Sequence, residues 1–163
     1  MRILRILCVP VFLTAFSSGL AAQGTQVAFG TIQQNEGLPV EVTADSLSID
    51  QNAGTALFTE NVIIVQGEMR LSADEVLVIY DAQASDVERI EAMGNVILIS
   101  GQDAAESERA DYDVSDGTIV MTGNVLVAQG PSALTSDTMT VRLDDGTAQM
   151  NGRVKTILQS GKN

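Results

Sequence analysis

The residues that could carry chemistry in this sequence are carboxylates, because histidine is absent and the single cysteine is Cys8. Asp111 and Asp113 lie two residues apart, so on a β-strand their side chains would share one face. Asp144 and Asp145 are adjacent in a segment that is typical of a turn. Paired carboxylates of this kind can hydrolyse glycosidic bonds or bind calcium ions.

The surroundings of these carboxylates favour a structural role over either chemistry. Calcium loops place a longer series of oxygen ligands at alternate positions, and the sequence contains no such series. Similar acidic residues recur along the chain in turn-like segments, which a unique catalytic pair would not do. There is also no glycine-rich phosphate loop after a predicted strand. We therefore predict a protein that is not an enzyme, with no cofactor and no metal ion.

The N-terminal segment has the layout of a secretory signal peptide. Arg2 and Arg5 precede an uncharged, mostly apolar segment at 6–20, and small residues follow up to Ala22. The apolar segment has about 15 residues, fewer than the roughly 20 that span a bilayer as a helix. We therefore predict a cleaved signal peptide over residues 1–22, with a retained membrane anchor as the alternative.

The mature chain would be strongly acidic and would have no cysteine. Loss of Arg2 and Arg5 leaves seven basic and 21 acidic residues, so the formal net charge changes from −12 to −14. Nucleic acids are not expected as partners, because their phosphates require cationic side chains. Disulfides cannot form, so packing and backbone pairing must stabilise the fold.

A unit of about 29 residues recurs four times between residues 40 and 158, as repeat proteins show. Acidic landmarks, spaced by 29, 34 and 29 residues, are Asp45, Asp74, Glu108 and Asp137. A second landmark, Asn-Val or Arg-Val, begins at positions 61, 95, 124 and 153. The longer spacing reflects five extra residues in the polar segment 81–86.

The sequence pattern of each unit predicts two β-strand segments. A turn such as Asp116-Gly117 or Asp145-Gly146 joins them. Apolar residues alternate with polar ones. Across each acidic landmark the apolar positions change from even to odd residue numbers, or from odd to even. A shift of this kind predicts a β-bulge, at which the carboxylate would accept hydrogen bonds from free backbone N–H groups. The glycines at positions 94, 123 and 152 predict a second bend. We therefore expect an all-β fold in which an elongated antiparallel sheet folds over on itself.

The inner face of this sheet is the expected binding site for an apolar ligand. The alternation places on it Val42, Leu47, Ile49, Phe58, Val62, Ile64, Leu71, Val76, Val78, Val96, Leu98, Met121, Val125 and Val127. The first and last strands have free edges that could pair with strands of other proteins. The residues of these two edges are Val40, Val42, Ala44, Arg153, Val154, Thr156 and Leu158. Residues 23–38 are expected to form a flexible lead and residues 159–163 a frayed tail.

Several segments resemble the OstA-like domain family. They are PVEVTAD at 39–45, ADYD at 110–113 and TGNV at 122–125 with Gln-Gly at 129–130. The resemblance of the sequence covers residues 39–158. The signal peptide, the size of the chain and the order of the landmarks are further features that the family shares. It implies a twisted β-jelly roll that is open at both ends like a slotted tube.

The resemblance also implies a function. Such a protein would reside in the periplasm and carry lipopolysaccharide, with the acyl chains of lipid A in an apolar groove. It would accept the lipid from an inner-membrane transport complex (LptC-like) at its N-terminal edge. It would pass the lipid to an outer-membrane translocon (LptD-like) at its C-terminal edge, and copies could associate head to tail.

Four positions that match lipid contacts in the family are Val40, Val42, Tyr112 and Val114. Because the chain has few lysines and arginines, we expect acyl chains to provide most of the recognition. Three other hypotheses remain open from the sequence. One is a membrane-anchored sibling of the same fold that retains the segment 6–20. The others are a purely structural β-repeat protein with a filled core, and a polysaccharide hydrolase that depends on Asp111 or Asp113.

Overall fold

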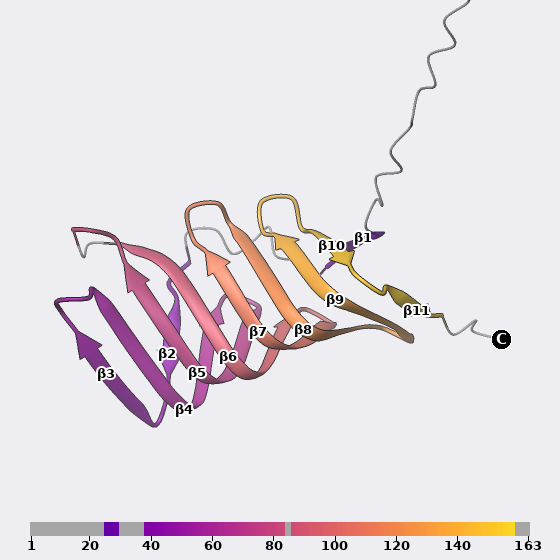
Figure 1. The fold of residues 1–163 in the computed structure, drawn as a ribbon. Helices are drawn as coiled ribbons and strands as arrows, with labels where there is room; N and C mark the ends of the chain where they lie inside the picture. The colour runs from indigo at the N-terminus through magenta and orange to yellow at the C-terminus, as the bar shows by residue number, and fades with distance from the viewer. Residues whose placement is uncertain (1–24, 30–37, 84–85, 159–163) are drawn as a thin grey trace, which may run out of the picture.

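The computed structural model describes residues 25–29, 38–83 and 86–158, which form an antiparallel sheet of 11 strands (Figure 1). The strands are β1 (Thr25–Ala28), β2 (Glu41–Thr43), β3 (Ser46–Asp50), β4 (Thr55–Gln66), β5 (Met69–Tyr80), β6 (Val87–Ser100), β7 (Asp103–Asp113), β8 (Thr118–Gln129), β9 (Ser132–Arg142), β10 (Thr147–Asn151) and β11 (Lys155–Ile157). No helix long and apolar enough to cross a membrane occurs among these residues. The all-β antiparallel architecture expected from the alternation is confirmed.

The sheet is ordered β1-β10-β9-β8-β7-β6-β5-β4-β2, so strands that follow one another in the chain are mostly neighbours. The long strands β4 to β9 each run across the whole fold. At one end of the sheet, β2 and β3 pair with different halves of β4. At the other end, β10 and β11 pair with different halves of β9. Short strands therefore form both ends of the sheet, and β1 adds a further short strand beside β10.

Each long strand bends near its middle, and the bends fold the sheet into two facing arms (Figure 1). The pairing registers shift there, between Thr59 and Val62 on β4, for example, and between Thr122 and Val125 on β8. We call arm 1 the part that contains β3, β10 and the turns at 51–54, 114–117 and 143–146. Arm 2 contains β2, β11 and the turns at 67–68, 101–102 and 130–131. The shift in apolar parity at the acidic landmarks therefore did predict the bends.

The hydrophobic core lies between the two arms. Alternate residues of every long strand point inward, as the period of two requires. Those buried on arm 1 include Ala56, Val76, Val78, Ile90, Ala92, Ala110, Ile119, Met121, Met139, Val141, Ala148 and Met150. Those buried on arm 2 include Val62, Ile64, Met69, Leu71, Val96, Leu98, Ala105, Val125, Val127 and Leu134. Burial of a valine or leucine side chain contributes roughly 1.5–3 kcal/mol, so this double layer is the main source of stability.

The structure differs from the expected flexible lead at residues 25–29. Thr25–Ala28 form β1, which pairs with β10 from Thr25 opposite Met150 to Ala28 opposite Thr147. The following residue, Phe29, is fully buried. An edge strand offers unpaired backbone groups to any extended segment within reach, which explains why this one joins the sheet. The expected signal peptide, the rest of the lead and the tail at 159–163 lie outside the described residues.

Candidate apolar ligand site

A small apolar cavity lies between the arms. Its lining residues come from five consecutive strands and from the segment before β2, and they are Val40, Ile64, Gln66, Met69, Leu71, Ile90, Ala92, Ala110, Tyr112 and Ile119. Its free volume is about 20 Å³, enough for one water molecule. This cavity is therefore too small for an acyl chain, which could enter it only if side chains moved or the arms separated.

Ten of the residues predicted to bind an apolar ligand are buried between the arms. They are Val62, Ile64, Leu71, Val76, Val78, Val96, Leu98, Met121, Val125 and Val127. Three more, Val42, Phe58 and Tyr112, are partly buried and pack against them. The structure thus brings most of the predicted residues to one continuous apolar surface, and the cavity lies within it.

Four of the predicted residues are instead exposed. Val40, Leu47, Ile49 and Val114 have exposed fractions of 46%, 55%, 64% and 36%. Leu47 lies opposite Phe58 and Ile49 opposite Ala56, so both belong to the inner face. Leu47 and Ile49 are exposed because β3 lies at one end of arm 1, and no other described strand continues the core over them.

Several cavity residues were not among the predicted contacts, namely Gln66, Met69, Ile90, Ala92, Ala110 and Ile119. The alternation contained the signal for most of them. Ala110, for example, lies two residues before Tyr112 and therefore faces the same side of β7. Gln66 could not have been found in this way, because a polar residue at an inward position breaks the pattern.

The acidic landmarks lie at the bends, where each carboxylate accepts a hydrogen bond from a side chain of the next long strand or its continuation. The donor–acceptor distances are 2.6 Å for Asn61 to Asp45, 2.7 Å for Asn95 to Asp74, 2.6 Å for Asn124 to Glu108 and 2.6–3.2 Å for Arg153 to Asp137. The expectation that these carboxylates accept backbone N–H groups is therefore corrected. All four donor residues have a positive φ, which turns their side chains toward the carboxylate.

The glycines that precede three of these donors fit closely against the carboxylates. A Cβ atom at Gly94 would lie 2.5 Å from Asp74 Oδ2, and one at Gly152 would lie 2.5 Å from Asp137 Oδ2. Both glycines also have a φ near +75°, which residues with a Cβ rarely adopt. The glycine and acidic landmarks together therefore form the bends, on the outside of the fold.

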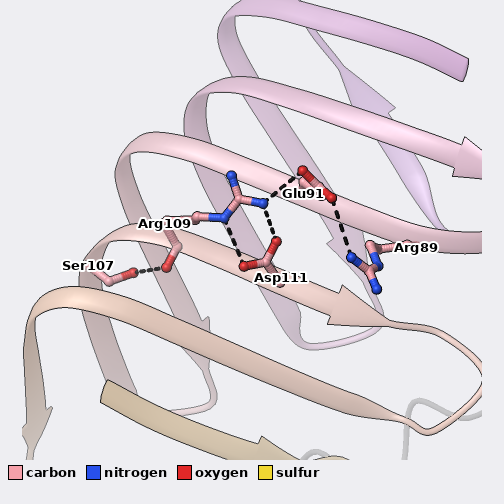
Figure 2. A network of polar contacts seen from close by, with 5 residues as sticks. All are labelled: Arg89, Glu91, Ser107, Arg109 and Asp111. Carbon is pink, nitrogen blue, oxygen red and sulfur yellow. Dashed lines mark hydrogen bonds and ion pairs between the residues drawn. The ribbon is translucent and has the colours of Figure 1, made fainter. Parts of the chain in front are cut away.

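The carboxylate of Asp111 belongs to an ion-pair network on the outer face (Figure 2). Arg109 donates from Nε to Asp111 Oδ2 at 2.8 Å and from Nη2 to Glu91 Oε2 at 2.7 Å. Arg89 lies 3.6 Å from the other oxygen of Glu91. The hydrogen bonds from Arg109 to Asp111 and Glu91 raise the pKa of the guanidinium, so its positive charge is held firmly. The network joins β6 to β7 on the face opposite the cavity.

Asp113 caps the turn that follows β7. Its Oδ1 atom accepts hydrogen bonds from the backbone and hydroxyl of Ser115 and from the backbone of Asp116, at 2.8–3.1 Å. The hydroxyl of Ser115 is the main cause of the lowered pKa of this carboxyl group. The two carboxylates that could have formed a hydrolytic pair thus have separate structural partners.

Comparison with known families decides the relationship. The sequence model of the family described as LptA/(LptD N-terminal domain) LPS transport protein matches residues 41–156. The chain belongs to this family. The resemblance to the OstA-like domain, which came from the landmarks at 39–45, 110–113 and 122–130, is confirmed.

Individual relatives agree with this assignment. The chain is 31% identical over 112 residues to an uncharacterized protein of Rhizobium meliloti (strain 1021). It is 26% identical over 91 residues to the lipopolysaccharide export system protein LptA of Haemophilus influenzae. These alignments cover 64% and 52% of this chain and 60% and 53% of the two relatives. The chain thus spans less than two thirds of the length of each relative.

The fold is similar to that of LptH from Pseudomonas aeruginosa, described as the LptA homologous periplasmic component of the conserved lipopolysaccharide transport device. The TM-score is 0.67, at 17% sequence identity, over 77% of this chain and 99% of that one. The likeness confirms the jelly-roll architecture of an elongated, folded antiparallel sheet.

Proposed function

We propose that this protein is a periplasmic bridge that carries lipopolysaccharide with its acyl chains held between the two arms of the sheet. It would receive the lipid from an inner-membrane transport complex and pass it to an outer-membrane translocon. The observation that supports this proposal best is the continuous apolar inner face, which runs through every strand from β4 to β10. Because the chain belongs to a lipopolysaccharide transport family, we infer that the ligand of this face is lipopolysaccharide.

The free energy of exposing acyl chains explains why such a face is needed. Each CH₂ group moved from water to an apolar site contributes about 0.8 kcal/mol, so one 12-carbon chain exposed to water costs on the order of 10 kcal/mol. A lipid with several such chains would cross an aqueous compartment very slowly without cover. An apolar path between the arms removes that barrier.

The recurrence of similar side chains along the sheet favours transfer over tight storage. Ile64, Leu98 and Val127 occupy equivalent inward positions on β4, β6 and β8. An acyl chain that moves from one strand to the next therefore meets a similar surface, and no single site binds it much more strongly than its neighbours. The driving force for directed movement would come from the partners.

The arrangement of charges favours recognition of the acyl chains over the head group. Arg89, Arg109 and Arg153 all form ion pairs with carboxylates of the chain itself, at distances of 2.5–3.6 Å. Arg109 also lies on the outer face, because the next residue, Ala110, lines the cavity and successive side chains of a strand point to opposite faces. These guanidinium groups are therefore poorly placed to bind lipid phosphates while they hold the sheet together.

The two ends of the sheet are the proposed contact sites for partners. The edge formed by β2 and β3 would receive the inner-membrane complex, and the edge near β11 would contact the translocon or a further copy. Lys155–Ile157 of β11 pair with β9, and their side chains are exposed. A strand from a partner could extend the sheet there by backbone hydrogen bonds. The membrane-anchored alternative predicts retention of residues 6–20, so the N-terminal sequence of the exported protein separates the two proposals.

Site-specific photo-crosslinking in cells tests the lipid-binding proposal. A photoreactive phenylalanine analogue is placed at Phe58 or Tyr112, whose side chains face the space between the arms. The matched controls are Leu57 and Val120, which lie on the outer face of β4 and β8 and are also only partly buried. We expect lipopolysaccharide adducts at the two inner positions and none at the controls. Absence of lipid at both inner positions would instead support a structural protein with a filled core.

A further inference from the structure

The row of inward-facing residues next to the turns of arm 2 is mostly polar. Each member lies directly opposite the next one in the pairing registers of β4 to β9, and directly paired residues share one face of the sheet. Two members, Gln66 and Met69, line the cavity, so the row faces the space between the arms. All members except Met69 carry an amide, hydroxyl or carboxylate group. We call this set the polar row, and it consists of Gln66, Met69, Ser100, Asp103, Gln129 and Ser132.

The rows beside and opposite the polar row are apolar. The next row toward the bend is buried and consists of Ile64, Leu71, Leu98, Ala105, Val127 and Leu134. The last row that crosses β4 to β9 on arm 1 consists of Ala56, Val78, Ile90, Tyr112, Ile119 and Val141. In these two rows the hydroxyl of Tyr112 is the one polar side-chain group. The space between the arms therefore has hydrogen-bonding groups along arm 2 and an apolar border along arm 1.

Ser100 is the member of the polar row that points most clearly to a ligand. Its side chain is fully buried, and its Oγ atom has no hydrogen-bond partner among the described residues. Ser100 lies two residues after Leu98 on β6, so its hydroxyl faces the same interior. A buried hydroxyl without a partner destabilises the fold, and an alanine would avoid that cost. A polar group of a ligand between the arms would supply the missing partner.

The glutamines of the polar row bind carbonyl oxygens in the absence of a ligand. Gln66 Nε2 donates to the backbone carbonyl of Leu38 at 3.2 Å. Gln129 Nε2 donates to the carbonyl of Ala28 at 2.6 Å and to Asp103 Oδ2 at 3.0 Å. A carboxamide has two N–H groups and an oxygen, and the contact to Leu38 uses one N–H of Gln66. An ester or amide group of a lipid presents the same kind of acceptor.

We propose that the polar row binds the ester or amide groups that attach the acyl chains of the lipid to its head group. The head group would then lie beside the turns of arm 2, and the acyl chains would extend over the apolar rows toward arm 1. The proposal rests on the proposed function, because it assigns an orientation to the lipid between the arms. Recognition of these groups needs no lysine or arginine, since amides and hydroxyls are neutral donors.

The carboxylate of Asp103 adds a preference within the polar row. It accepts a hydrogen bond from Gln129, which holds the amide toward the same row. Its negative charge would repel a lipid phosphate at this position, because like charges repel most strongly away from water. The polar row thus suits the neutral linkage groups of the lipid and excludes its phosphates. Phosphates would lie outside the space between the arms.

Paramagnetic broadening measures the orientation of the bound lipid. The mature protein with labelled methyl groups is bound to lipopolysaccharide that carries a nitroxide on its head group, and the reduced nitroxide is the control. We expect several-fold stronger broadening at Leu71 and Leu98, beside the polar row, than at Val78 and Val141 on arm 1. Equal broadening on both arms, or stronger broadening on arm 1, would overturn the orientation alone. No broadening at any inner methyl group would overturn the proposed function as well.

Ser100→Ala tests the hydrogen bond itself. We expect the dissociation constant of lipopolysaccharide to rise roughly two- to tenfold, which is the range that one hydrogen bond gives. The matched control is Ser72→Ala on β5, whose side chain faces outward because its neighbour Leu71 is buried inward. It should leave the dissociation constant unchanged. Equal or tighter binding by Ser100→Ala would overturn the proposal, because purely apolar recognition does not need the hydroxyl.

The stability of the lipid-free variant separates a ligand contact from a structural one. Ser100→Ala should be at least as stable as the unaltered protein in urea unfolding, because the removed hydroxyl has no partner among the described residues. A clear loss of stability in the absence of lipid would show that the hydroxyl serves the fold itself, and the assignment to the ligand would then be wrong.

Discussion

Asn124 Nδ2 lies 2.6 Å from Glu108 Oε1, in a hydrogen bond that joins β7 to β8 at the bend of the sheet. Asn124 has a φ of 48°, so a residue in the left-handed region holds the carboxylate of the strand before it. The same relationship holds between Asn95 and Asp74 on the preceding pair of strands. These contacts lie at the bend between the two arms, and the bend determines the shape of the space between them.

The bend is sensitive to the size of the residue that precedes each asparagine. A Cβ atom at Gly123 would lie 2.7 Å from Glu108 Cβ, and the φ of Gly123 is +86°. At Gly130 the φ is also positive but nothing lies within 4 Å. Gly130→Ala should therefore lose only the roughly 1–2 kcal/mol of the left-handed conformation. Gly123→Ala should lose about 1–3 kcal/mol more through the clash. Urea unfolding of both variants measures the difference, and equal losses would show that the close approach has no energetic weight.

The bend at β11 should contribute a pH dependence to stability. The hydrogen bonds from Arg153 lower the pKa of the Asp137 carboxyl group. A carboxylate whose pKa is lowered in the folded state stabilises the fold above its unfolded pKa of about 3.9, and this contribution is lost as the pH falls through the folded pKa. In Arg153→Gln the pKa of Asp137 should return toward its ordinary value. NMR titration of the side-chain carboxyl carbons measures this, and an unchanged Asp137 titration would contradict the assignment.

The cavity between the arms offers a way to alter ligand uptake without a change of charge. Ala92 is buried, lines the cavity, and has an inward-facing Cβ. Ala92→Val adds two methyl groups to a free volume of about 20 Å³, so we expect several-fold less lipid capture at Tyr112. Ala128→Val makes the same change at an exposed position and should leave capture unchanged. Equal capture in the two variants would show that the ligand does not use this part of the interior.

Much of this fold could be predicted from the sequence, because its decisive patterns are local. The alternation at Val62 and Ile64 assigned the inner face of β4, and the parity shift near Asp74 assigned a bend. The pairing of β1 could not be predicted, since its partner β10 lies about 120 residues away and only proximity in the fold brings them together. The donors at the bends were also missed, because a positive φ at Asn95 cannot be read from residue type alone.

The candidate site was predictable in outline but not in detail. The residues of its surface follow from the period of two, whereas the volume left between them depends on how closely the arms approach. Leu47 and Ile49 are exposed because no further strand lies beside β3 in the described sheet. The alternation within β3 cannot predict whether another strand lies next to it. The sequence thus specified which face is apolar, and tertiary packing specified where it is closed.

The central claim is that acyl chains lie between the two arms, and methyl NMR measures this most directly. The perdeuterated protein carries labelled methyl groups on leucine, isoleucine and valine, and it is bound to lipopolysaccharide with ¹³C-labelled acyl chains. Intermolecular NOEs should connect the acyl chains to inner-face methyl groups such as those of Leu98, Ile119 and Val127. Outer-face methyl groups, such as those of Leu77 and Leu126, should show none. NOEs confined to the outer face, or lipid binding without NOEs to the inner face, would contradict the account.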